Sequence, residues 1–232
     1  MIIAHKLSKK YAGVSVLNIP SIEIKPGKTL GLVGNNGAGK TTFFNLLLDL
    51  IAPTTGYITS KGVKVNQSEE WKQYSSSYID ESFLIGYLTP EEYFYFIGDL
   101  RAMNKADVDL FIEQFKDFFN NELLGQKKYL RDLSKGNQKK AGIIGALIGK
   151  PELIILDEPF SNLDPSTQIR LKNIIEDLTK EQNVTVLISS HDLGHVSEVS
   201  DRIIVLEKGE IVKDIQTSKA TLEELQNYFS VE

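Results

Sequence analysis

The sequence predicts an α/β fold with a largely parallel sheet, and three observations support this prediction. Short apolar runs, several of them rich in β-branched residues, occur at 19–24, 29–33, 153–156, 184–188 and 203–206. Such runs are typical of strands that are buried on both faces of a parallel sheet. Longer segments with helical spacing separate the runs, which is the alternation expected of α/β proteins. With 232 residues, the chain is long enough to bury a sizeable core.

The composition restricts the classes of function. The formal net charge of -5 indicates no broad basic surface, so nucleic acid is not an expected partner. The absence of cysteine excludes disulfides and thiolate metal sites. No segment approaches the roughly 20 apolar residues that span a bilayer. A role in membrane transport would therefore need a separate transmembrane partner.

A glycine-rich loop lies between the apolar run at 29–33 and a helical segment that follows it. The motif G-x-x-x-x-G-K-T comprises Gly34, Asn35, Asn36, Gly37, Ala38, Gly39, Lys40 and Thr41, with Thr42 next. Glycines let backbone N–H groups approach phosphate oxygens, and the positive end of the helix attracts the anion. In this strand–loop–helix setting the motif predicts a nucleotide site. We expect Lys40 to reach the β- and γ-phosphates and Thr41 to bind Mg²⁺.

The stretch from about residue 67 to residue 133 differs in character from the rest of the chain. Thr89-Pro90-Glu91-Glu92 has the form of a capping box and predicts a helix start. Apolar residues then recur at helical spacing, which predicts the core face of a helical lobe: Val108, Phe111, Ile112, Phe115, Phe118 and Phe119. The run at 141–149 reads as a buried helix. Thr221-Leu222-Glu223-Glu224 repeats the capping pattern and predicts a closing helix.

The apolar run at 153–156 ends in two carboxylates, Asp157 and Glu158. Phosphoryl transfer to water needs a carboxylate that supports Mg²⁺ and a group that orients the attacking water. We expect Asp157 to support the metal and Glu158 to act as general base.

The order of these motifs resembles that of the nucleotide-binding domains of the ATP-binding-cassette (ABC) family, over nearly the whole chain. Residues 34–42 look like the Walker A loop, and 153–158 like the Walker B strand with its catalytic glutamate. Leu133-Ser134-Lys135-Gly136-Asn137 is similar to the family signature Leu-Ser-Gly-Gly-Gln. Residues 161–164 resemble the loop after Walker B.

Two single residues also resemble family positions. His191 is similar to the switch histidine, and Tyr11 falls where the family stacks an aromatic ring on adenine. The resemblance implies a P-loop NTPase core, an N-terminal antiparallel β portion and an inserted helical lobe at approximately 82–145. It also implies a single domain over 1–232 that binds ATP with Mg²⁺.

The chain departs from the family pattern at two places. In the signature, Lys135 and Asn137 replace the commonest glycine and glutamine, while Ser134 and Gly136 are retained. In the segment that aligns with the glutamine loop, Glu81 replaces the glutamine. A carboxylate can still contact Mg²⁺ or water, but it cannot donate a hydrogen bond.

The resemblance also implies how two such domains would work together. They would face each other head to tail, with Ser134 and Gly136 of one covering the ATP on the Walker motifs of the other. Lys40, Glu158 and His191 would carry out hydrolysis in each site. The second domain could be the same chain or a different one.

Two kinds of partner remain open for this ATPase. The segments around Tyr78–Glu81 and 88–92 are similar to the ATPase subunits of bacterial multi-subunit (ABC-2-like) exporters, which dock a transmembrane permease and lie on the cytoplasmic face of the cell membrane. The run Tyr93-Phe94-Tyr95-Phe96 would then be a docking surface, or equally part of the core. The alternative is a soluble cassette ATPase that acts on a non-membrane partner, such as an assembly complex. A regulatory module without turnover is disfavoured because Glu158 and His191 are both present.

Overall fold

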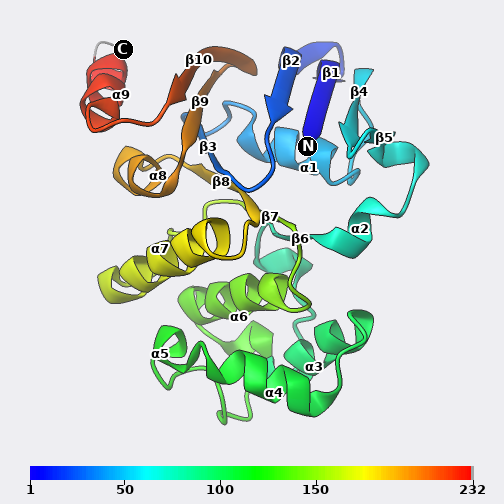
Figure 1. The fold of residues 1–232 in the computed structure, drawn as a ribbon, viewed down its shortest axis with the longest axis vertical. Helices are drawn as coiled ribbons and strands as arrows, with labels where there is room; N and C mark the ends of the chain where they lie inside the picture. Colours follow the sequence, from blue (N-terminus) through cyan, green and yellow to red (C-terminus); the bar gives the residue numbers. More distant parts are fainter. Residues whose placement is uncertain (231–232) are drawn as a thin grey trace.

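The computed structural model describes residues 1–230, and their largest sheet runs through the middle of the fold (Figure 1). Its strand order is β10 (Glu210–Gln216), β9 (Arg202–Glu207), β3 (Thr29–Val33), β8 (Thr185–Ser190), β7 (Leu153–Leu156) and β6 (Ser75–Tyr78). Neighbouring strands are parallel except β9 and β10, which are antiparallel. Strands β3, β7 and β8 are buried along their whole length. The predicted α/β fold with a largely parallel sheet is confirmed.

A second sheet is antiparallel and belongs to the N-terminal part, as expected. Its order is β2 (Val14–Ile24), β1 (Ile2–Tyr11), β4 (Thr55–Ser60) and β5 (Val63–Lys64). The assignment of 19–24 to a strand buried on both faces of the parallel sheet is wrong. Ile19, Ile22 and Ile24 are buried, whereas Pro20 and Glu23 are exposed. This alternation is typical of an antiparallel strand with one solvated face, and an edge strand tolerates a proline that lacks an N–H.

The core lies on both faces of the large sheet. On one face Leu153 and Ile155 of β7 pack with the small sheet, α1 (Lys40–Leu47) and Trp71 of the short helix α2 (Trp71–Tyr74). On the other face Ile154 and Leu156 pack with the helical lobe and α7 (Pro165–Lys180). Helices α8 (Leu193–Val199) and α9 (Thr221–Ser230) pack against each other and cover the β3–β9 end of the sheet.

Helix α9 begins at Thr221 as expected, but the capping box predicted there is wrong. The Thr221 hydroxyl accepts a hydrogen bond from the Ser218 N–H at 2.8 Å, and the Glu224 N–H donates to the Ala220 carbonyl. Thr221 therefore stabilises the turn that enters the helix rather than the first helical N–H groups.

The helical lobe lies between β6 and β7 in the sequence and at the opposite end of the molecule from the small sheet (Figure 1). It contains α3 (Pro90–Leu100), α4 (Lys105–Glu113), α5 (Lys116–Phe119) and α6 (Lys135–Leu147). The capping box at Thr89 and Glu92 is present in both directions. The apolar stripe is divided between α4 and α5, and its members Val108, Ile112, Phe118 and Phe119 are buried in the core. The boundaries 82–145 stay a prediction.

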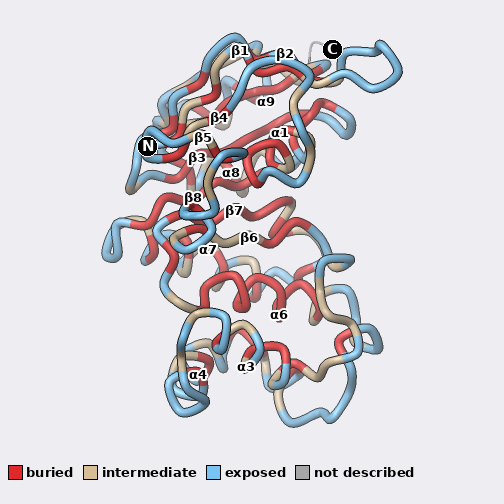
Figure 2. Tube along the Cα trace, turned by 90° about the vertical axis from the view of Figure 1, so that its right-hand side faces the viewer, coloured by how far each residue is buried: buried red, intermediate tan, exposed pale blue. Residues whose placement is uncertain are grey.

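Helix α6 is buried from end to end except at its first residues (Figure 2). Two glycines let aromatic rings lie directly on it. A Cβ on Gly142 would stand 2.2 Å from Cδ2 of Tyr78, and one on Gly145 would stand 2.6 Å from Cε1 of Tyr93. The run 141–149 is therefore a buried helix for most of its length, as predicted. In the part of the chain that the structure describes, no helix is both long and apolar enough to cross a membrane.

Candidate active site

The phosphate loop connects β3 to α1 and is shaped by close approaches to neighbouring strands. A Cβ on Gly34 would stand 2.3 Å from the carbonyl oxygen of Leu206. Gly39, which precedes the helix, has a φ of 107°, a left-handed conformation that glycine adopts without steric cost. Asn35, Asn36 and Gly37 are exposed at the tip of the loop. The loop therefore presents backbone N–H groups to solvent at the N-terminus of α1, the setting that binds phosphate.

Lys40 folds back across this loop. Its side chain is only 7% exposed, and its Nζ donates to the Gly34 carbonyl at 2.6 Å. The same Nζ lies 3.4 Å from Oε1 of Glu158. The predicted phosphate-binding cation and the predicted base are thus neighbours, although 118 positions in the sequence separate them.

Asp157 follows β7 and receives two hydroxyl hydrogen bonds. Thr41 Oγ1 donates to its Oδ2 at 2.5 Å, and Ser189 Oγ donates to its Oδ1. Burial raises the pKa of the Asp157 carboxyl, while the two hydrogen bonds act in the opposite direction. Thr41 and Asp157, which we expected to share Mg²⁺, are therefore brought together.

This pair of oxygen ligands fits Mg²⁺, which prefers hard oxygen donors and usually takes only one or two from protein carboxylates. Among residues 1–230 no cluster of three or more His, Asp or Glu side chains could hold a metal alone. A magnesium ion here would complete its shell with water and substrate phosphate oxygens.

Glu158 lies between Lys40 and His191. Its Oε2 is 2.9 Å from Nδ1 of His191, which follows β8, the neighbour of β7 in the sheet. Its Oε1 is buried and has no hydrogen-bond partner among the described residues. The backbone of Glu158 has a φ of 47°, which is disfavoured for a residue with a Cβ. Oε1 faces the Lys40 ammonium without a hydrogen bond, so this carboxylate oxygen keeps lone pairs that can accept a proton from water once Lys40 binds phosphate.

Glu81 lies in a different set of contacts from Thr41 and Asp157. Its Oε1 accepts a hydrogen bond from the Tyr78 hydroxyl at 2.9 Å, and its Oε2 is 3.8 Å from Nζ of Lys135. Burial and this hydrogen bond raise the pKa of Tyr78. The two departures from the family pattern, Glu81 and Lys135, are thus an ion pair within one chain. A role for Glu81 at Mg²⁺ stays a prediction.

The signature residues begin α6. The Ser134 side chain caps the helix by accepting the Asn137 N–H at 3.2 Å. Gly136 lies against the loop after β7, where an added Cβ would stand 2.7 Å from the Asn162 carbonyl oxygen. Gly136 therefore brings the start of α6 close to the loop at 161–164 of its own chain. Completion of a second chain's site by Ser134 and Gly136 stays a prediction.

Tyr11, the predicted adenine-stacking residue, ends β1 at the β1–β2 turn, and its ring is 51% exposed. The Lys9 ammonium lies 4.8 Å from the ring centroid. The following strand, β2, approaches the phosphate loop, because a Cβ on Gly39 would stand 3.1 Å from the Val16 carbonyl oxygen. Tyr11 is therefore an accessible ring on a hairpin that packs beside the loop, and its role is still a prediction.

Sequence reasoning missed two polar residues of this site. Ser189 links the Asp157 carboxylate to the Glu158 backbone, since its Oγ donates to Asp157 and accepts the Glu158 N–H at 2.9 Å. Lys139 of α6 donates to the Glu158 carbonyl at 2.7 Å. The position of Ser189 at the end of an apolar run was a usable signal, because carboxyl ends of parallel strands meet at one edge. No local pattern marked Lys139.

Fold and site together define a phosphate-loop ATPase, and comparison with known proteins places it further. The family model described as "ABC transporter" matches residues 17–161. An uncharacterized ABC transporter ATP-binding protein of Methanocaldococcus jannaschii is 35% identical over 229 residues, which cover 95% of this chain and 81% of that protein. A bacitracin transport ATP-binding protein of Enterococcus faecalis is 32% identical over 216 residues, covering 92% and 68%.

A solved structure agrees in fold. The ATP-binding cassette MJ0796, determined as a dimer in a post-hydrolysis state with ADP and Pi, has a TM-score of 0.83 at 23% identity, covering 94% of this chain and 99% of that one. The chain belongs to the ABC transporter family and is an ATP-binding ATPase subunit of that family.

Proposed function

We propose that this chain drives export across a membrane, as one of two cassettes that close head to tail on ATP. The observation that supports this most directly is the grouping of Lys40, Glu158 and His191 at the carboxyl edge of the sheet. The signature residues lie elsewhere: Ser134 caps the N-terminus of α6, and Gly136 lies against the loop after β7. An ATP site made from both sets of residues is then completed by a second cassette.

In this proposal Glu158 accepts a proton from the attacking water, and His191 holds the Glu158 carboxylate in place through Oε2. Lys40, now bonded to the Gly34 carbonyl, exchanges that contact for phosphate oxygens and stabilises the charge that develops there. Thr41 and Asp157 would hold Mg²⁺, which neutralises phosphate charge when bound. Because ATP lies in the interface, it favours closure by its higher affinity for the closed pair.

We propose that the permease docks in a groove next to the aromatic run 93–96, where the lobe meets the sheet. A cavity of about 490 Å³ lies between the chain segment ending in β6, helix α3 and helix α6. Its rim includes Leu100, which is 67% exposed, and Phe96 of the neighbouring turn is 41% exposed. Tyr93 and Phe94 are buried, so only part of the aromatic run is available for docking. In this proposal the permease docks from the cytoplasmic face of the membrane.

The hydrolytic half of the proposal is tested with Glu158→Gln. The variant should retain ATP binding, lose about 10²- to 10⁴-fold of its turnover, the usual contribution of a general base, and accumulate as an ATP-loaded dimer. Turnover by phosphate release and mass by light scattering are the measurements. Hydrolysis at the wild-type rate would show that Glu158 is not the base.

The transport half is tested with Leu100→Asp, with Leu110→Asp as the matched control. Leu110 is 71% exposed on α4 of the same lobe but does not line the groove. Vesicles that contain the membrane-spanning chain encoded beside this one should bind the wild type and the Leu110→Asp variant. They should not bind the Leu100→Asp variant. Equal binding of both variants contradicts docking in this groove, and absence of any membrane binding favours the alternative of a soluble assembly ATPase.

A further inference from the structure

Lys139 is a buried cation on α6 that contacts residues 158–161, the loop after β7 that carries Glu158 and is called the catalytic loop below. It is 4% exposed, and its Nζ donates to the Glu158 carbonyl at 2.7 Å and to Ser161 Oγ at 2.6 Å. The same Nζ lies 5.8 Å from the ring centroid of Tyr78. Burying an ammonium group costs free energy unless the group is paired or hydrogen-bonded. These hydrogen bonds therefore restrict the position of the Lys139 side chain.

The turn that Lys139 binds is the one that aims Glu158. The Glu158 carbonyl accepts hydrogen bonds from Lys139 and from Ser161 Oγ, the latter at 3.0 Å, and the Glu158 N–H donates to Ser189 Oγ. Its backbone is in the left-handed region, a conformation that persists only where the surroundings enforce it. The side chain of Glu158 is held by Lys40 at Oε1 and by His191 at Oε2, and the backbone contacts fix the turn from which that side chain extends.

The charges around Lys139 come from both sides of α6. Burial lowers the pKa of Lys139, and the carboxylates of Glu81, Glu158 and Asp157 act in the opposite direction. Glu81 is also paired with Lys135, one turn earlier on the same helix. Two lysines of α6 therefore make separate contacts: Lys135 pairs with Glu81 after β6, and Lys139 bonds to the loop after β7.

We propose that Lys139 is a positioning residue for ATP hydrolysis, holding the backbone of Glu158 so that its carboxylate faces the attacking water. Because α6 begins with the signature Ser134 and Gly136, Lys139 joins that segment to the base of the same chain. A displacement of α6 would move Glu158 with it. The inference rests on the proposed role of Glu158 as general base.

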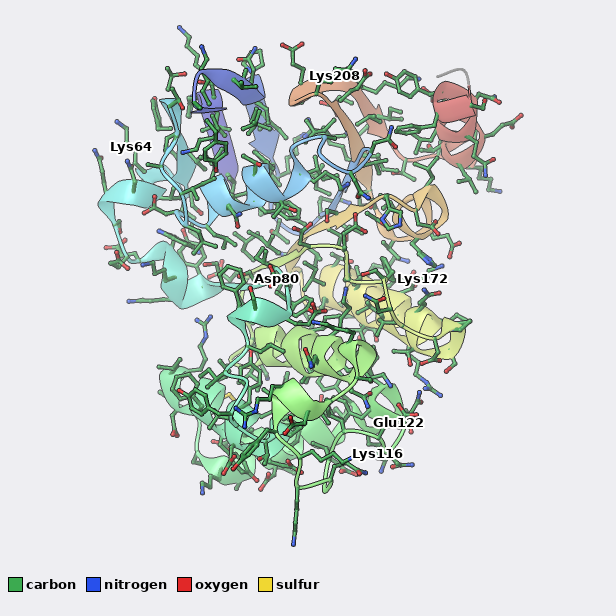
Figure 3. The ribbon with its side chains drawn as sticks, turned by 180° about the vertical axis from the view of Figure 1, so that it is seen from behind. Lys64, Asp80, Lys116, Glu122, Lys172 and Lys208 are labelled. Carbon is green, nitrogen blue, oxygen red and sulfur yellow. The ribbon has the colours of Figure 1, made fainter. Side chains whose placement is uncertain are left out.

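The test compares Lys139→Met with Lys139→Arg and with Lys140→Met as the matched control. Lys140 is equally buried, at 3% exposed, on the same helix, but it pairs with Glu122 of the lobe at 3.0 Å (Glu122 is labelled in Figure 3). A misplacement of about 1 Å in a catalytic group can cost about 10²-fold in rate. Lys139→Met should lower kcat by about that factor, with affinity for a non-hydrolysable ATP analogue nearly unchanged, and Lys139→Arg should recover part of the rate.

Melting temperature and analogue affinity separate this role from a structural one. If Lys139→Met and Lys140→Met lower kcat equally, or if kcat and analogue affinity fall together with the melting temperature, Lys139 is structural and the proposal is overturned. Ser161→Ala, a milder change, should lower kcat less than Lys139→Met does while leaving analogue affinity unchanged.

The same change in the Glu158→Gln background separates the two proposals. There Lys139→Met should lower the residual rate no further, because residues that act as a unit are non-additive. A further fall would mean that Lys139 acts independently of Glu158, which overturns the positioning role while leaving the base assignment intact. Wild-type turnover by Glu158→Gln alone would instead remove the base assignment on which the inference rests.

Discussion

Gly142→Ala is predicted to destabilise the protein because it would force α6 away from Tyr78. The added Cβ would stand 2.2 Å from Cδ2 and 2.3 Å from Cε2 of the ring, where carbon atoms in contact normally lie about 3.5–4.0 Å apart. The ring is 3% exposed and its hydroxyl is bonded to Glu81 at 2.9 Å, so it has little freedom to move. Relief of the overlap would need a shift of more than about 1 Å.

The expected magnitude is the balance of two opposing effects. Overpacking a well-filled core costs about 1–3 kcal/mol. Alanine is favoured over glycine inside a helix by about 1 kcal/mol, which offsets part of that cost. We therefore expect Gly142→Ala to lower the free energy of unfolding by about 1 kcal/mol, or the melting temperature by about 2–4 °C for a domain of this size.

Urea unfolding of a double-mutant set isolates the ring contact. Tyr78→Leu removes the ring atoms that the Cβ would meet most closely and leaves Cδ2 of Leu84 at 3.2 Å. Gly142→Ala in that background should therefore lose most of its cost, and helix propensity could make it stabilising by up to about 1 kcal/mol. Tyr78→Phe keeps the ring but removes its hydrogen bond to Glu81, so Gly142→Ala should cost no more than in wild type and clearly more than in the Tyr78→Leu background. If the substitution stabilises all three backgrounds equally at unchanged m-value, the contact does not constrain α6 and the reasoning is refuted.

Two further predictions concern Lys40, the expected phosphate-binding residue, and His195, which is partly buried. Lys40→Ala should weaken ATP binding by about 10- to 100-fold, since a hydrogen bond to a charged group contributes about 1.5–3 kcal/mol, and unchanged affinity by calorimetry contradicts the role of Lys40. His195 packs on Phe160 with ring centroids 4.7 Å apart, and burial is the main cause that lowers the pKa of His195. Because the pKa of His195 is lower in the folded state, the unfolded chain binds the proton more readily. The contribution of neutral His195 to the free energy of unfolding is therefore complete above the unfolded-state pKa of about 6.5 and is lost as the pH falls through and below that value. Urea unfolding at pH 7.5 and 5.5 should therefore show a larger acid loss in wild type than in His195→Gln, and equal losses would remove His195 as the cause.

The parts of the fold that the sequence predicted are those with a local signal. Residues 34–41 lie between an apolar run and a helix, and Thr89-Pro90-Glu91-Glu92 forms the expected capping box. The misreading of 19–24 has a physical reason: three isoleucines in six residues look like a fully buried run. All three are buried, but the residues between them are exposed because β2 is partly solvated. Thr221 has the capping residue types but bonds to Ser218, since the preceding turn competes for its hydroxyl.

The sequence predicted the site residues that belong to recognisable motifs. It did not predict residues that reach the site only through long-range contacts. Asp157, Glu158 and His191 end two strands that are neighbours in the sheet, so their proximity follows from parallel topology. Lys139 contacts Glu158 from α6, and nothing in the sequence around either residue indicates this contact. The pairing of Glu81 with Lys135 is of the same kind. Glu81 and Lys135 both depart from the family pattern, and in the structure their opposite charges lie next to each other.

The same reasoning explains how α6 can be buried with so few large apolar side chains. Its glycines accept the rings of Tyr78 and Tyr93 against the helix backbone, which fills space that leucine side chains would otherwise occupy. Its buried lysines are tolerated because each has an oxygen partner, Lys139 on the catalytic loop and Lys140 on Glu122. Since the partners of Lys139 belong to the loop that carries the base, the contacts that let this helix be buried are also those that place Glu158. Stability of the lobe junction and rate of hydrolysis are therefore expected to be coupled through Lys139 and not through Lys140.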